Sequence, residues 1–150
     1  MIRRCLLAFA LTAALVGAVG PAWAQLSSCE RGDFVGVVEE AAGALRDLNH
    51  EQRPRFQEKL RELKDKKGWS HDQFMVEAVP FVQDDKITAY DARSAELLDR
   101  ISRLGESGGA APKLDCAVLI DLRGYMKALV DIQKEKWDYM FGKLEGAMRG

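Results

Sequence analysis

The C-terminal stretch from Asp115 to about Ala147 most constrains the fold, because its apolar side chains recur at helical spacing. They are Leu119, Leu122, Met126, Leu129, Ile132, Met140, Leu144 and Ala147. Steps of three and four residues place such positions on one face of an α-helix. About 33 residues with a rise of 1.5 Å each give a helix of about 50 Å. This is longer than a small bundle needs, so we expect the helix to form a wall of the domain and to project beyond it.

Four shorter helices are predicted before this stretch, each from apolar periodicity between a capping residue and a helix breaker. They span approximately residues 33–48, 49–67, 70–79 and 84–104, and the predicted capping residues of the first, third and fourth are Asp33, Ser70 (in a capping box with Gln73) and Asp84 or Asp85. The second begins at the capping box Asn49-x-x-Gln52 or at Pro54, Pro80 ends or kinks the third, and Gly105 ends the fourth. No alternation of period two persists, so no strand is predicted. The expected fold is all-α, a small up-and-down bundle of four to five helices with a long C-terminal helix.

The N-terminus has the three parts of a secretory signal peptide. Arg3 and Arg4 precede an apolar run over residues 6–19, and the small-x-small sequence of residues 22–24 follows it. The run is too short for a membrane anchor, which needs about 20 apolar residues. We therefore expect residues 1–24 to be a signal peptide, and residues 25–150 to form a single periplasmic or secreted helical domain with no integral membrane span after processing.

Two cysteines remain in the predicted mature chain, Cys29 and Cys116. In an oxidising compartment a single disulfide between them is the simplest arrangement. In an up-and-down bundle of five helices the first and fifth helices start at the same end, which is where these cysteines lie. The alternative is a lipid anchor, because residues 26–29 have the form of a bacterial lipobox with Cys29 as the modified residue.

Charge and motif content argue against several classes of function. Removing Arg3 and Arg4 leaves 20 of the 22 Lys and Arg side chains against all 23 acids, a formal net charge of −3. This balance is not typical of a nucleic-acid-binding protein. The familiar catalytic and cofactor motifs are absent from the sequence, so we predict no catalytic residue, no cofactor and no enzyme. His50 and His71 occupy similar capping contexts about 27 Å apart along one helix, so no metal site is predicted.

One short motif carries a resemblance. The run Leu48-Asn49-His50-Glu51-Gln52-Arg53 resembles the Leu-Thr-x-x-Gln element of periplasmic stress chaperones and metal sensors related to CpxP and Spy, with Asn49 in place of the threonine. The resemblance implies binding of unfolded or partner proteins, independent of ATP, through a concave helical surface.

A candidate contact surface lies near the C-terminus, where Trp137, Tyr139, Met140 and Phe141 fall within five positions. Such residues point in too many directions for one buried stripe, and exposed aromatic and Met side chains anchor protein interfaces. These four residues are therefore predicted to bind a partner. The alternative is that they pack inside the bundle or across a homodimer.

The expected function is that of an exported, non-enzymatic protein that binds an envelope protein as a chaperone, accessory subunit or inhibitor. Two alternatives stay open: a periplasmic carrier or sensor of a small ligand or metal, and an envelope protein anchored by lipid at Cys29. Neither the partner nor the oligomeric state follows from the sequence.

Overall fold

The computed structural model describes residues 29–110 and 115–150, and every regular element in these residues is helical. The elements are α1 (Arg31–Lys67), α2 (His71–Glu77), α3 (Val79–Val82), α4 (Asp85–Ala110) and α5 (Cys116–Arg149). The all-α fold with a long C-terminal helix is thus confirmed. The predicted signal peptide lies outside the described residues. Within the described ranges, no helix is both long and apolar enough to cross a bilayer.

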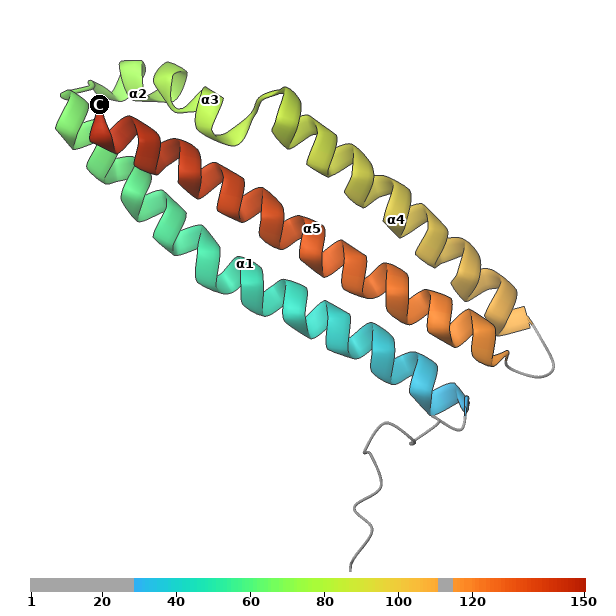
Figure 1. Cartoon of the computed structure of the whole chain (residues 1–150). Coiled ribbons are helices and arrows are strands. Elements are labelled where there is room, and N and C mark those ends of the chain that lie inside the picture. The colour runs from blue at the N-terminus through green and yellow to red at the C-terminus, as the bar shows by residue number, and fades with distance from the viewer. Residues whose placement is uncertain (1–28, 111–114) are drawn as a thin grey trace, which may run out of the picture.

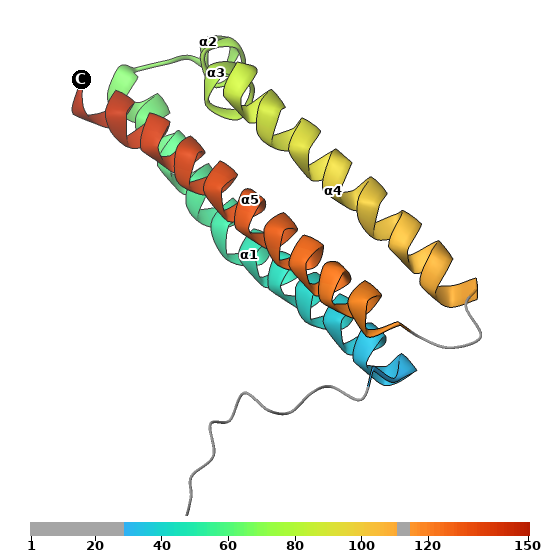
Figure 2. The same cartoon turned by 45° about the vertical axis from the view of Figure 1, so that its right-hand side comes forward.

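The three long helices lie side by side with α5 in the middle (Figures 1 and 2). Helices α1 and α4 both pack along α5 and have little direct contact with each other. The chain runs along α1, crosses the end of the bundle through α2 and α3, returns along α4 and runs back along α5 to the C-terminus (Figure 1). Helix α1 is as long as α5, so the expected projection of the C-terminal helix beyond the domain is wrong.

Cys29 and Cys116 form a disulfide, as predicted, with 5.3 Å between their Cα atoms. The bond ties the start of α1 to the start of α5 at one end of the bundle (Figure 1). The two helices start at the same end, as predicted, but for a different reason: only α1, α4 and α5 run along the bundle, in place of five alternating helices. The direction of the chain reverses between α1 and α4 and again between α4 and α5, so α1 and α5 start at the same end.

The predicted helix boundary at Leu48 and Asn49 is wrong, because α1 continues through both residues and through Pro54. The Asn49 side chain does not cap a helix start; its Nδ2 donates to the carbonyl of Leu45, one turn back, at 3.0 Å. Its Oδ1 accepts a hydrogen bond from Trp137 Nε1 on α5 at 3.2 Å. Packing against α5 over the whole length therefore outweighs the hydrogen bond that Pro54 removes from α1.

The later boundaries are partly as expected. Ser70 caps α2, accepting from the backbone amide of Gln73 at 3.2 Å, while the Gln73 side chain accepts from the Ser70 amide. Pro80 does not kink this helix; it lies in the first turn of the separate short helix α3, where its missing amide costs nothing. The predicted end at Gly105 is wrong, because α4 runs to Ala110. A glycine permits a helix to end but does not require it.

Asp84 and Asp33, the other two predicted capping residues, have different roles. Asp84 caps α4, accepting from the amide of Ile87 at 2.8 Å. Helix α1 begins two residues earlier than predicted, and Asp33 accepts from the backbone amide of Glu30, which stands at the cap position. Asp33 is therefore the third residue of the helix and stabilises its positive end from inside the first turn.

The buried core has two separate clusters. The larger lies at the end of the bundle where α2 and α3 cross, and we call this the crossing end; its members are Phe56, Leu60, Leu63, Ile87, Met140 and Leu144. The smaller lies near the disulfide, at what we call the disulfide end, and contains Val37, Leu119 and Leu122. Between them a polar contact joins α4 to α5, where Gln133 Nε2 donates to the buried Ser94 Oγ at 2.8 Å.

Candidate functional site

The most prominent apolar concavity is a groove between α1 and α4 at the disulfide end, with α5 as its floor. It has a volume of about 520 Å³. Its walls and floor are formed by Arg31, Phe34, Val35, Val38, Glu39, Ile101, Leu104, Gly105, Leu122 and Met126. We call this concavity the open groove.

The open groove follows from the way α1 and α4 use α5. Each helix packs its apolar stripe on α5, and little side-chain contact joins the two helices directly. Val35 and Val38 lie on the flank of α1 beside that stripe and are 50% and 41% exposed. Leu98 is 52% exposed on α4 and lies three residues before Ile101 and seven before Gly105, so it shares their helix face. The groove therefore displays apolar surface where a closed bundle would have another helix.

A single basic and a single acidic side chain stand at the edge of the open groove. Arg31 and Glu39 lie on α1 among the residues that line it. Neither forms an ion pair within residues 29–110 and 115–150. Both charges are therefore free to meet charges on whatever occupies the groove.

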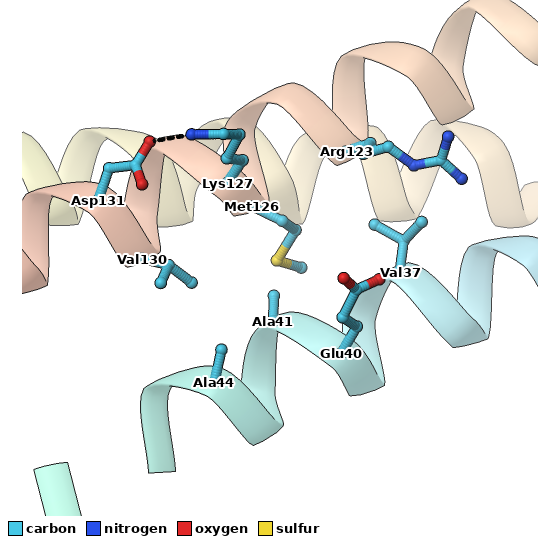
Figure 3. Close-up of a pocket in the computed structure, with 9 residues that line it drawn as sticks. All are labelled: Val37, Glu40, Ala41, Ala44, Arg123, Met126, Lys127, Val130 and Asp131. Carbon is cyan, nitrogen blue, oxygen red and sulfur yellow. Dashed lines mark hydrogen bonds and ion pairs between the residues drawn. The ribbon is translucent and has the colours of Figure 1, made fainter. Parts of the chain in front are cut away.

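A second concavity of about 440 Å³ lies between α1 and α5 on the other flank of α1 (Figure 3). Met126 and Val130 point from α5 toward the short side chains of Ala41 and Ala44 on α1, which leave the space between the helices unfilled. Its edge is charged, and the ion pair at 2.5 Å between Lys127 and Asp131 joins side chains one turn apart on α5 (Figure 3). Such an exposed pair adds little stability.

The chain was compared with family models, curated proteins and solved structures. None of them matches.

The four residues predicted to bind a partner all lie on α5 at the crossing end and contact their own chain. Met140 is buried in the larger core cluster, and the rings of Trp137 and Phe141 pack edge-on against Phe56 of α1, with centroids 5.8 and 5.5 Å away. The hydroxyl of Tyr139 donates to Asp84 Oδ2 at 2.9 Å. Trp137, Tyr139 and Phe141 remain half-buried, so their binding of a partner stays a prediction.

An electrostatic contact centred on Asp84 holds α4 and α3 to α5 at the crossing end. Lys143 Nζ donates to the Asp84 carboxylate and to the carbonyl of Pro80. The bond from Lys143, assisted by the Ile87 amide and the Tyr139 hydroxyl, lowers the pKa of Asp84 from 3.8 to about 2. The same carboxylate raises the pKa of Tyr139, because the phenol is needed as a donor. The arrangement joins α3, α4 and α5 at this end of the bundle.

Helices α2 and α3 carry a second exposed apolar surface that the sequence reasoning did not identify. Phe74 and Phe81 pack toward the larger core cluster. The opposite side of the same short helices is exposed and carries Met75, Val76, Val79 and Val82. Apolar residues on both sides of a short helix were the available signal, because an amphipathic helix buries only one of them.

The histidines do not form a shared site. His50 lies in the middle of α1 and His71 is the first residue of α2, and both are exposed. No group of three or more His, Cys, Asp or Glu side chains suited to a metal ion occurs in the part of the chain that the structure describes.

Proposed function

We propose that this protein is an exported, non-enzymatic binding protein whose open groove holds an apolar helical segment of an envelope protein. The observation that carries the proposal is the exposed apolar surface of the open groove, to which Val35 and Val38 contribute, and which Leu98 extends along α4 beyond the groove residues. A helix laid in this groove would contact α1, α4 and α5 together and complete a four-helix arrangement. A chaperone, an accessory subunit or an inhibitor could each act through such a contact.

Two features support an extracytoplasmic location. The sequence begins with a basic, an apolar and a small-residue region in the order of a signal peptide. The Cys29–Cys116 disulfide suits an oxidising compartment. We therefore propose that the protein acts in the periplasm or outside the cell.

The test is site-specific photo-crosslinking in the intact envelope. A photoreactive residue at position 38, inside the open groove, is expected to trap a discrete partner, and the trapped peptide should be an apolar helical segment. Leu98→Asp should abolish the adduct, because it places a charge on the apolar wall. The matched control is position 120 on α5: Ile120 is 68% exposed but is not among the groove residues. An absence of adducts from position 38, or the same adducts from both positions, would overturn the proposal.

A small apolar ligand is the second candidate for the open groove. A volume of about 520 Å³ falls in the range of small-molecule sites, and Arg31 at the edge could pair with a carboxylate at the end of an acyl chain. Native mass spectrometry of freshly purified protein tests this directly. A bound mass that Arg31→Ala releases would support a carrier, whereas protein recovered without any added mass would remove this candidate.

A further inference from the structure

The charges at the edge of the open groove are arranged symmetrically about one exposed apolar residue. Arg31 precedes Val35 by four residues and Glu39 follows it by four, so the three side chains form one stripe along the first turns of α1. At 1.5 Å per residue the two charges lie about 12 Å apart along the helix axis. Val35, at the midpoint, is half exposed.

This arrangement singles out α1 among the exposed apolar surfaces of the described residues. The large apolar side chains that are exposed are Val35, Val38, Met75, Val76, Val79, Val82, Leu98 and Ile120. Only Val35 has a basic residue four positions before it and an acidic residue four positions after it. A second copy of the same stripe, turned end to end, therefore presents opposite charges to it at both ends.

We propose that the open groove is occupied by a second copy of this chain, in a twofold symmetric dimer whose axis passes beside Val35. With the two α1 helices antiparallel, Arg31 of each copy faces Glu39 of the other, and the two Val35 side chains meet at the axis. An interface that uses the same patch on both copies must be self-complementary in this way. Val38 of each copy then packs toward the α4 wall of the other, so the exposed apolar surface of both copies is covered.

The dimer and the proposed function share one premise, which is that the open groove is a binding site. The dimer would regulate access to that site. A groove filled by a second copy cannot hold a partner helix at the same time. Binding of the partner and dimer formation are therefore mutually exclusive, and the dimer protects the apolar groove while no partner is present.

Sedimentation equilibrium of the disulfide-bonded mature protein, without any partner, tests the dimer. The wild type should associate reversibly with rising concentration. Arg31→Glu and Glu39→Arg should each raise the dissociation constant by about tenfold or more, because each replaces two attractive contacts by two repulsive ones. The double variant R31E/E39R restores both pairs with exchanged partners and should recover the wild-type constant. Glu40→Arg is the matched control, because Glu40 lines the pocket on the other flank of α1.

Cross-linking through a new cysteine locates the symmetry axis. Val35→Cys should oxidise to a covalent dimer, because the two copies of residue 35 face each other, while His50→Cys on the exposed surface should not. A protein that stays monomeric at all concentrations would overturn the inference, as would failure of the double variant to recover or equal cross-linking from both positions. Such a result leaves the proposed function standing if position 38 still traps a partner. Conversely, a dimer whose only adduct from position 38 is a second copy of this chain overturns the proposed function alone.

Discussion

The crossing end and the disulfide end of this bundle are stabilised by different means. At the crossing end, side chains from α1, α4 and α5 fill a continuous apolar cluster, α2 and α3 cover it, and the Asp84–Lys143 contact lies beside it. At the disulfide end the buried cluster has three members among the described residues, and the covalent bond between Cys29 and Cys116 adds to this smaller amount of packing. The covalent link stabilises this end while apolar surface stays exposed there. Exposed apolar surface is what the proposed binding of a partner requires.

The largest expected effect is the loss of the disulfide. The bond closes a loop of 87 residues, and the chain-entropy treatment assigns such a loop about 4 to 5 kcal/mol of stabilisation. The variant with both Cys29→Ser and Cys116→Ser should lose a stabilisation of up to this size in urea unfolding. Its amide hydrogen exchange should rise most at the starts of α1 and α5. Equal increases in exchange rate at both ends of the bundle would contradict the view that packing stabilises the crossing end and the covalent bond the disulfide end.

Removal of buried core volume should give the next largest effect, and removal of an exposed groove side chain should give a much smaller one. Leu144 is fully buried in the larger cluster, so Leu144→Ala is expected to lower the free energy of unfolding by about 2 to 5 kcal/mol. Val35→Ala at the disulfide end removes a half-exposed side chain and should cost about 0.5 kcal/mol or less. Chemical denaturation of both variants, carried out below the concentration at which the wild type associates, makes the comparison. Similar losses would mean that Val35 is packed as tightly as a core residue of the crossing end and does not line an open surface.

Between the two ends, the hydrogen bond from Gln133 to Ser94 marks the border. Ser94 is buried and also donates to the carbonyl of Tyr90 at 2.9 Å. Ser94→Ala leaves the Gln133 amide without its acceptor and should cost about 1 to 2 kcal/mol. The double variant S94A/Q133L removes the donor as well, so it should recover most of that loss. A double variant no more stable than S94A would show that Gln133 finds another partner.

The helices, the all-α class and the cysteine pairing could be predicted from sequence because their causes are local or follow from counting. Apolar spacing predicted α4 and α5, and the Ser70 capping box predicted the start of α2. The bond followed from the two cysteines that remain after the predicted signal peptide. The helix boundary predicted at Asn49 was wrong because the hydrogen-bond partner of Asn49 is distant in the sequence. Its side chain takes a hydrogen bond from Trp137, 88 positions away, and no local pattern distinguishes that role from a cap.

The open groove could not be predicted for a related reason. Val35 and Val38 are the same residue type as Val37 and lie in the same turn of α1, yet only Val37 is buried. Which of the three is covered depends on where α4 and α5 pack against α1. The contacts of Trp137 near the C-terminus could not be predicted either, because Phe56 and Asn49, which provide them, lie on α1 and far away in the sequence. Burial of an apolar residue depends on the neighbouring helix as much as on its own.

Acid should weaken the crossing end by removing the charge on Asp84. The pKa of Asp84 is about 2 in the folded protein and near 3.8 otherwise, so the carboxylate stabilises the fold above about pH 4 and loses this effect as the pH falls toward 2. Asp84→Asn keeps a good capping residue and removes only the charge. The variant should be less stable than wild type at pH 6, and the difference should shrink toward pH 2. A difference that does not change with pH would show that Lys143 contributes little at this site.

The smallest expected effect asks whether α5 itself differs between the two ends. Gly124 lies in its half near the disulfide and Gly142 in its half near the crossing end, and a Cβ built at either position meets nothing within 4 Å. Because alanine has less backbone freedom to lose on folding, Gly124→Ala and Gly142→Ala should each stabilise the protein by about 0.5 to 1 kcal/mol. Equal gains in thermal or urea unfolding would mean that α5 is equally ordered along its length. The contrast between the ends would then lie in what packs on α5. A gain at position 142 alone would show that the half of α5 near the disulfide is frayed in the folded protein.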